Sequence, residues 1–394
     1  MPALDQTDLA DFLDFRSFLT DEEHQRLNGL RLHLDEHVRP IADDYWERGV
    51  SPRHLLPGLA ELGLFGAAFP EVREYENTAL FRGWVSYEIA RADASTSTLS
   101  GVHSGLAMTS IALGGSDEQR AKWLGPMARA EVIGAFGLTE PLSGSDTSGG
   151  LRTTARRDGD EWILDGAKRW IGNGTFADVV VIWARDIADD TVRGFLVPAG
   201  TPGFQATKIQ RKIALRAVEN ADISLEGVRV SEANRLQRID GFRDVARVLR
   251  ATRADVAWQA LGNGAAAYEA AVAYTTTREQ FGRPIASFQL VQSKLVTAAE
   301  HIAASVAVCT RIAQLQEAGT LRDEQSAMAK ALVADRMRTT VALCRESLGG
   351  NGIQLDYGVA RPFADAEAIY TYEGTNEMNS LIVGRAITGI PAFI

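Results

Sequence analysis

The periodicity of hydrophobic residues changes twice along the chain, and this change limits the possible folds more than any other feature. From about Leu19 to Arg129, apolar residues recur at helical spacing, as in DEEHQRLNGLRLHLDEHVRP. From about Val132 to Leu236 the pattern is typical of strands, and after Ile239 long helical stretches continue to the end. Because helices and strands occupy separate blocks instead of alternating, we expect an α+β fold and not a parallel sheet of βαβ units.

Three domains are expected from these blocks. They are an N-terminal all-α domain over 1–131, a middle β-domain over 132–238 and a C-terminal helical bundle domain over 239–394. Within the middle block, Asp158-Gly159 and Asp165-Gly166 are hairpin-type turn signals between β-rich runs. A chain of 394 residues is long enough to bury the cores that such domains need.

Charge and composition exclude several classes of function. The formal net charge of −10 argues against nucleic acid or an anionic membrane as the main partner. The acidic start MPALDQTDLADFLDF lacks a secretory pattern, and the longest apolar run, ADVVVIWA at 177–184, is too short to span a bilayer. Cys309 and Cys344 have no metal-type spacing and are expected to be buried free thiols. We therefore expect a cytoplasmic protein that binds neither nucleic acid nor membrane.

Two kinds of site are poorly supported. The glycine-rich pieces LGNGAAA and LGGNGIQ lack the G-x-G-x-x-G spacing and the βαβ context of a dinucleotide fold. His33 and His37 are four residues apart, but HLDEH lacks the H-E-x-x-H order and no third ligand is evident. We expect no metal site.

The stretch AEAIYTYEGTNEMNS at 366–380 is helical in pattern on both sides of Gly374 and carries three glutamates. A glycine inside a helix costs roughly 1 kcal/mol relative to alanine, so a compensating role is expected. Glu367 is expected to face solvent or a neighbouring helix, and at this point either one of the acids is a catalytic base or the segment is only a solvated helix end.

Three further segments could hold a ligand, although ordinary turns and core packing remain open for each. FGLTEPLSGSDTSGG at 136–150 leads from a strand into a loop of small residues. KRWIGNGTFAD at 168–178 places Trp170 beside glycines, which suits packing against a flat ring. In TTREQFGRPIASFQ, Arg278 lies at a helix end near an aromatic residue and could clamp a pyrophosphate.

Taken together, these segments resemble the acyl-CoA dehydrogenase family of flavoproteins. Its two signatures are similar to GLTEPLSGSDTSG at 137–149 and to ESLGGNGIQLDYGVARPFAD from Glu346, and YEGT at 372–375 follows at the expected place. The resemblance extends from about residue 20 to 392. In detail the chain is similar to the glutaryl-CoA dehydrogenase branch and to plant short-chain acyl-CoA oxidases. It implies a middle β-barrel or sandwich domain and a C-terminal four-helix bundle.

The resemblance implies FAD as cofactor, held partly across a subunit interface of a homotetramer, a dimer of dimers. Residues implied in contacts within one chain are Phe136, Leu138, Thr139, Gly144, Ser145, Trp170, Ile171 and Gly172. Those implied to reach FAD of a neighbouring subunit are Arg278, Phe281, Gln289, Glu346, Gly349 and Gly350, with Thr375 and Glu377 near the adenosine portion. Those implied in contacts with the substrate are Ser97, Ser145, Arg253, Tyr372 and Gly374.

The implied reaction is α,β-dehydrogenation of an acyl-CoA thioester to the trans-2-enoyl-CoA. Glu373 would abstract the α-proton while the β-hydride passes to flavin N5. The electrons would then pass to an acceptor such as an electron-transfer flavoprotein or O2.

Two departures from the family pattern refine this expectation. Many members carry serine or threonine where this chain has Gly172, so we expect extra room there, one hydrogen-bond donor fewer and measurable oxygen reactivity. Glutaryl-specific members carry an arginine where this chain has Ser97, so we expect a neutral short-chain substrate. An acyl-CoA oxidase, a glutaryl-CoA dehydrogenase, or a repurposed member (a tailoring flavin monooxygenase or a nucleic-acid-protecting flavoprotein) remain the alternatives.

Overall fold

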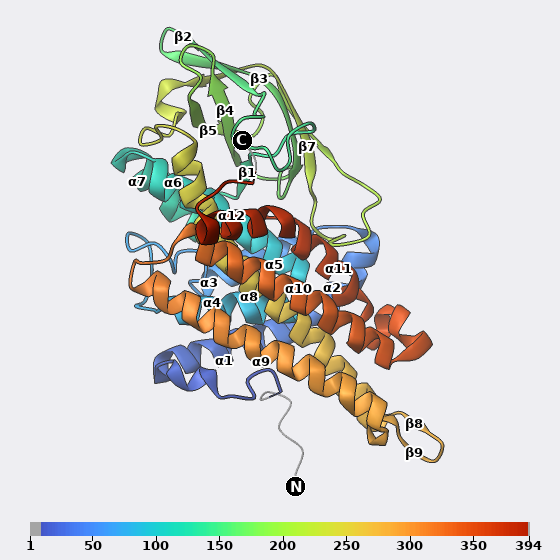
Figure 1. Ribbon diagram of the computed structural model, residues 1–394. Coiled ribbons are helices and arrows are strands. Elements are labelled where there is room, and N and C mark those ends of the chain that lie inside the picture. Colours follow the sequence, from blue (N-terminus) through green and yellow to red (C-terminus); the bar gives the residue numbers. More distant parts are fainter. Residues whose placement is uncertain (1–8, 393–394) are drawn as a thin grey trace.

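The computed structural model describes residues 9–392 (Figure 1). Residues 1–8 and 393–394 lie outside the described residues. The expectation about targeting sequences depends in part on these residues. Helices form the first part of the chain, a β-sheet the middle part and long helices the last part. The expected order of a helical domain, a β-domain and a second helical domain is confirmed.

The N-terminal domain is helical, and capping side chains set the starts of several of its helices. Thr20 and Glu23 form a capping box at α1, and Ser116 and Gln119 form another at α7. The elements are η1 Phe15–Phe18, α1 Asp21–His37, α2 Arg39–Arg48, η2 Arg53–Leu55, α3 Leu56–Glu61, α4 Ala79–Ala92, α5 Ala94–Ser100, η3 Gly101–Met108, α6 Thr109–Gly114 and α7 Asp117–Ala128. Of these, η3 is π-helical, a rare geometry that is frequent at functional sites.

The middle domain is a seven-stranded half-barrel with the path β1-β4-β2-β3-β7-β6, in which β5 pairs with β4. Its strands are β1 Gly134–Gly137, β2 Thr154–Asp158, β3 Glu161–Ile171, β4 Val179–Asp186, β5 Val192–Pro198, β6 Phe204–Lys208 and β7 Ala221–Ser231. The central strand β4 reads VVVIWARD and is buried along nearly all its length, as expected for a strand covered on both faces.

One of the two predicted hairpin turns is wrong. Asp158-Gly159 does begin the turn between β2 and β3, since Asp158 pairs with Glu161 across it. Asp165-Gly166 instead lies inside β3, where the pairing with β7 shifts register between Leu164 and Gly166. Gly166 has φ +149°, and a Cβ there would lie 2.6 Å from the Thr153 hydroxyl oxygen. The glycine therefore marks a β-bulge with close packing and not a chain reversal.

The C-terminal domain contains three long helices and two shorter ones. They are α8 Phe242–Thr277, α9 Gln289–Glu317, α10 Asp323–Ser347, α11 Ala360–Thr371 and α12 Asn376–Thr388, together with the hairpin β8 Glu279–Gln280 and β9 Arg283–Pro284 and the short turns η4 Glu232–Asn234, η5 Ile285–Ser287, η6 Gly349–Ile353 and η7 Leu355–Tyr357. Cys309 on α9 and Cys344 on α10 are buried free thiols, as expected.

Helix α9 is long and apolar enough to cross a membrane by length and composition alone, with mean hydropathy 1.3 in its most apolar window. In the structure it packs against α8, α10 and α4 as one of the helices of the C-terminal domain (Figure 1). It is therefore a packed helix of this fold and not a membrane span.

The three domains meet around η3. This segment packs against β1 of the middle domain and against α8 of the C-terminal domain. The His103 ring accepts a hydrogen bond from the Gly134 amide at 3.0 Å and donates one to the Met127 carbonyl at 2.9 Å. These contacts place the start of β1 next to the helices that enclose the candidate site.

Candidate active site

Glu373 lies in the break between α11 and α12 that the sequence predicts. Its φ is +55° and that of Gly374 is +89°, so two successive residues adopt the left-handed conformation. This conformation is costly for a glutamate and is found mainly at functional sites. Thr375 then restarts the helix, because its hydroxyl accepts a hydrogen bond from the Met378 amide at 3.3 Å.

Three side chains hold this break in place. The Thr252 hydroxyl donates to Glu373 Oε2 at 3.0 Å, and Arg253 Nε donates to the Glu373 carbonyl at 3.3 Å. Lys330, fully buried on α10, donates to the carbonyls of Tyr370 at 2.6 Å and Gly374 at 3.0 Å. The ammonium thereby satisfies carbonyls that the broken helix leaves without amide partners. Glu367, in contrast, pairs with Arg338 of α10 at 2.7 Å, in agreement with its expected position beside a neighbouring helix.

Burial raises the pKa of Glu373 above its ordinary value, while Arg253, the Thr252 hydrogen bond and Lys330 each act in the opposite direction. A carboxylate with a raised pKa is a stronger base when it is ionised. The carboxyl group is thus held between a water-poor environment and three polar partners, as a general base near neutral pH requires.

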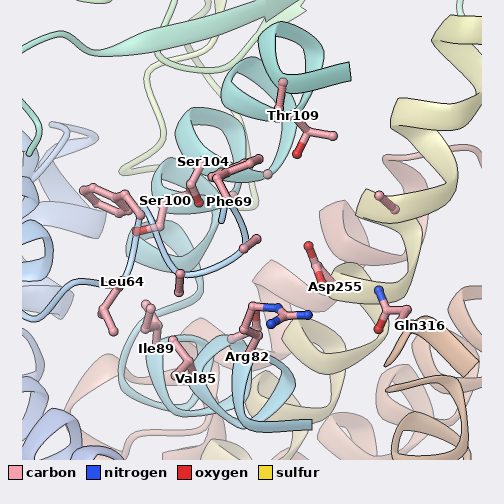
Figure 2. Close-up of a pocket in the computed structure, with 18 of the residues that line it drawn as sticks. Leu64, Phe69, Arg82, Val85, Ile89, Ser100, Ser104, Thr109, Asp255 and Gln316 are labelled. Atoms are coloured by element: carbon pink, nitrogen blue, oxygen red, sulfur yellow. The ribbon is translucent and has the colours of Figure 1, made fainter. Parts of the chain in front are cut away.

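A cavity of about 470 Å³ (Figure 2) is lined by Ala251 and Asp255, which flank Thr252, the residue that donates to Glu373. It is enclosed by the loop after α3, by α4, by η3 and by α8. Asp255 lines it, one helical turn beyond Thr252, whereas Glu373 itself is not among the lining residues. Ser97, one of the expected substrate contacts, also lines the cavity.

Tyr372 connects the glutamate segment to the cavity wall. Its hydroxyl donates to Gln259 Oε1 at 2.6 Å, and Gln259 lines the cavity. On η3, Gly101 leaves room for the side-chain amide of Gln259, since a Cβ there would lie 2.9 Å from Gln259 Nε2. Tyr372, Glu373, Gly374 and Arg253 are therefore brought together, as the sequence predicts for a substrate site.

The residues expected against the flavin ring also gather at one place. Phe136 is on β1, with Leu138 and Thr139 directly after it, and the Thr139 carbonyl accepts from the Arg169 amide at 2.8 Å. Trp170 follows on β3, where a second register shift relative to β7 lies between Lys168 and Ile171. Its φ is +65° and half of its surface is exposed. A large exposed indole on strained backbone suits a surface that covers a flat ligand.

The extra room expected at Gly172 is absent. A Cβ at Gly172 would lie 2.9 Å from Cγ2 of Val102, a residue of η3. The space of the serine or threonine side chain in other members of the family is thus filled by a valine methyl group. The expected loss of a hydrogen-bond donor stands, but the expected gain of space is wrong because a residue distant in sequence occupies it.

The loop after Thr139 suits the phosphate part of the cofactor. Gly144 and Ser145 are exposed, and nothing lies within 4 Å of a Cβ placed on Gly144. Its backbone can thus approach a ligand closely, and Ser145 supplies a free hydroxyl on the same stretch. Together with the exposed face of Trp170, the donors and surfaces present fit a flavin nucleotide.

The remaining expected cofactor residues lie elsewhere. Arg278, at the C-terminal end of α8, and Phe281, in the β8–β9 hairpin, are exposed, as are the other members of this group, Gln289, Glu346, Gly349 and Gly350. Figure 1 shows the β8–β9 hairpin at the opposite end of the molecule from the middle domain. The structure therefore does not bring this group to the Trp170 surface of the same chain. Thr375 and Glu377 are at the start of α12, where Glu377 is exposed.

Several residues of the site were missed by sequence reasoning. Thr252 directly precedes Arg253 in RATRAD and could have been noticed there, whereas Lys330 carries no local signal. Arg82, from α4, lines the cavity and supplies a cation that the argument from Ser97 did not consider. Asp255 lines the same cavity and offsets that charge.

Comparisons with known proteins show which family the chain belongs to. Family models for the N-terminal, middle and C-terminal domains of acyl-CoA dehydrogenases match residues 20–131, 135–228 and 240–388. The bovine (Bos taurus) mitochondrial short-chain specific acyl-CoA dehydrogenase is 32% identical over 94% of this chain and 91% of its own length. The 3-(aryl)acrylate reductase of Clostridium sporogenes is 33% identical over 92% of this chain and 97% of its own length.

Solved structures show the same relationship. A glutaryl-CoA dehydrogenase from Mycobacterium smegmatis superposes with a TM-score of 0.93 at 37% identity, over 98% of this chain and 99% of that one. A second structure of a glutaryl-CoA dehydrogenase from that organism, in complex with FADH2, has the same TM-score at 34% identity and the same coverage. The named activities differ among these relatives, so they do not decide the substrate. The chain belongs to the acyl-CoA dehydrogenase family of enzymes.

Proposed function

We propose that this protein is a cytoplasmic, FAD-dependent acyl-CoA dehydrogenase that acts on a neutral short-chain acyl-CoA thioester. The observation that carries the proposal is the geometry of Glu373. Its carboxylate accepts a hydrogen bond from Thr252, its backbone is held open at Gly374, and Gln259, which bonds the adjacent Tyr372, lines a cavity large enough for a short acyl chain. The complex of a related protein with FADH2 supports the cofactor.

In the proposed reaction, Glu373 removes a proton from the carbon next to the thioester carbonyl. Burial raises its pKa and so its basicity, while the Thr252 hydroxyl fixes the orientation of its carboxylate. Within the described residues, the Glu373 backbone N–H has no protein acceptor, which leaves it available to the thioester oxygen. FAD, when bound, supplies the chemistry of accepting the β-hydride.

The residues proposed to hold FAD divide into two sets. Phe136, Leu138, Thr139, Trp170 and Ile171, with Gly144 and Ser145, form the set of one chain, and the exposed set around Arg278 and Phe281 belongs to a neighbouring subunit. Phe281 is 94% exposed and Leu290 is 81% exposed, which is unusual for apolar side chains and supports burial in a homotetramer. Arg278→Ala is expected to lower FAD content, whereas Arg26→Ala, on the exposed side of α1, leaves it unchanged.

The electron acceptor is proposed to be a protein, such as an electron-transfer flavoprotein, and not O2. The valine methyl group that fills the space beside Gly172 supports this choice, because it closes the one opening that the sequence indicated near the flavin edge. Substrate-reduced enzyme exposed to air should then stay bleached for minutes. Rapid reoxidation with formation of hydrogen peroxide would favour the oxidase.

Anaerobic stopped-flow measurement of flavin absorbance tests the activity directly. Butyryl-CoA is expected to bleach the flavin with a higher kcat/KM than glutaryl-CoA, because Asp255 in the cavity repels a second carboxylate. A preference for glutaryl-CoA contradicts the substrate class. Failure of every acyl-CoA to bleach the flavin contradicts the proposed function as a whole.

A further inference from the structure

The cavity lined by Asp255 has an apolar side and a charged side. Leu64, Val85 and Ile89 form the apolar side, while Arg82 reaches toward Asp255 and Gln316 on the other (Figure 2). An acyl pocket for a plain hydrocarbon tail needs no charged lining, since burying unpaired charges is costly. The charged side therefore needs an explanation that the proposed dehydrogenation does not supply.

Arg82 is held in position by the side-chain amide of Asn77. Its Nη1 donates to Asn77 Oδ1 at 2.7 Å, and within the described part of the chain it forms no ion pair. Burial lowers the pKa of its guanidinium, which nevertheless remains charged at physiological pH, and Asp255 is the largest influence in the other direction. Several of its N–H groups remain available to a ligand in the cavity.

The Asp255 carboxyl lines the same cavity and can accept a hydrogen bond there. It lies three residues beyond Thr252 on α8, and no side-chain hydrogen bond of its carboxyl is formed with residues 9–392. Burial raises its pKa to about 7, so the group is ionised in mildly alkaline solution. Gly105 on η3 faces it, because a Cβ there would lie 4.0 Å from Asp255 Oδ2. Gly105 and Asp255 both line the cavity.

An aliphatic tail in this cavity would displace water from both groups and pair with neither. A buried polar group that is left without a partner destabilises the complex. A carboxylate tail would pair with Arg82 but would be repelled by Asp255. A neutral group that accepts from Arg82 and donates to Asp255 satisfies both residues. Because desaturation consumes hydrogens on C2 and C3, such a group must be on C4 or beyond.

We propose that Arg82 and Asp255 form a specificity subsite for an acyl chain that carries a carboxamide or hydroxyl group at C4 or beyond. The subsite rests on the proposed function, since it positions the distal part of the same thioester. It makes the enzyme selective against both hydrocarbon and dicarboxylic acyl chains of similar size.

Three acyl-CoA thioesters of nearly equal shape test this subsite. They are 4-carbamoylbutanoyl-CoA, glutaryl-CoA and 5-methylhexanoyl-CoA, which end in an amide, a carboxylate and two methyl groups. At pH 8, kcat/KM for flavin bleaching is expected to be at least about tenfold higher for the amide than for either of the others. Equal or higher values for 5-methylhexanoyl-CoA or for glutaryl-CoA overturn the proposal.

Two variants separate the roles of the charges. Asp255→Leu is expected to reduce the preference for the amide over 5-methylhexanoyl-CoA to about threefold or less. Asp255→Asn changes little in shape, and it is expected to raise kcat/KM for glutaryl-CoA about tenfold relative to the amide by removing the repulsion. Asp160→Asn, an exposed aspartate in the β2–β3 turn, serves as the matched control.

The outcomes distinguish this subsite from the underlying activity. If butyryl-CoA bleaches the flavin but the three thioesters react alike, the subsite is refuted and the dehydrogenase activity stands. If Asp255→Asn leaves the ratio of glutaryl-CoA to the amide unchanged, the assignment of Asp255 is refuted. If no thioester, butyryl-CoA included, bleaches the flavin, the proposed function itself fails.

Discussion

The hydrogen bond from Thr252 to Glu373 gives the sharpest test of the proposed base. Thr252 is buried on α8, and its Oγ1 lies 3.0 Å from Glu373 Oε2. The hydroxyl donates to the carboxylate and so stabilises the ionised form. Thr252→Val keeps the shape of the side chain and removes the donor. Loss of this hydrogen bond must therefore raise the pKa of Glu373 further above the ordinary value.

The size of the expected pKa change follows from the strength of the hydrogen bond between Thr252 and Glu373. Hydrogen bonds to charged groups contribute about 1.5–3 kcal/mol. The same hydroxyl also lies 3.2 Å from the Leu249 carbonyl, which competes for its proton, and Glu373 is only half-buried by its surface area. The lower end of the range therefore applies, and about 1.4 kcal/mol corresponds to one pKa unit.

The assay is the pH dependence of flavin bleaching by butyryl-CoA under anaerobic conditions. In Thr252→Val the midpoint of the acid limb is expected to move up by about one pH unit. The rate should fall about tenfold below the midpoint and remain that of the unmodified enzyme well above it. The control is Thr276→Val, at an exposed threonine of the same helix whose hydroxyl bonds the Val272 and Ala273 carbonyls. A midpoint that stays in place, or moves to lower pH, would refute the role of this hydrogen bond.

Three further predictions concern the base, the flavin edge and the domain junction. Glu373→Gln is expected to retain FAD and bind acyl-CoA but to lose flavin bleaching by a factor of about 10² or more, and bleaching at the unmodified rate would place the base elsewhere. Gly172→Ser is expected to lower stability by about 1–3 kcal/mol because its Cβ meets Val102, and the double variant with Val102→Ala should recover it, as measured by thermal unfolding. Burial lowers the pKa of His103 to about 4, below its unfolded value, so the unfolded chain binds more protons between about pH 4 and 6.5 and stability falls with acidification in that window. From pH 7 to pH 5 the free energy of unfolding, measured with urea, is expected to fall by about 2 kcal/mol. His103→Gln should remove this pH dependence, whereas replacing the half-exposed His37 by Gln should preserve it.

Local sequence predicted much of the fold and the helix break that holds the candidate base. The changes in periodicity predicted the order of helical, β and helical domains, because periods of 3.6 and 2 are properties of short segments. The break before Gly374 was predicted for the same reason, since a glycine between two helical patterns is a local signal, and Glu373 was chosen because it is adjacent to it. The turn at Asp158-Gly159 was also predicted from neighbouring residues, whereas Trp170 was open between ligand and core packing until the structure showed it half-exposed.

The tertiary structure decided whatever depends on residues far apart in the chain. Asp165-Gly166 has the composition of a turn, yet pairing with β7 keeps it inside a strand as a bulge. The space at Gly172 depends on Val102, and the hydroxyl that orients Glu373 comes from a residue 121 positions earlier.

The charged side of the cavity is the clearest case. Arg82 and Asp255 come from separate helices, and neither has a sequence context that indicates a ligand. The sequence by itself determined the domain order, the helix break and the candidate base, because backbone preference and hydrophobic spacing are local. Only the packing of α4, η3 and α8 decided which polar groups share one cavity with the substrate, because side-chain proximity is a property of the folded chain.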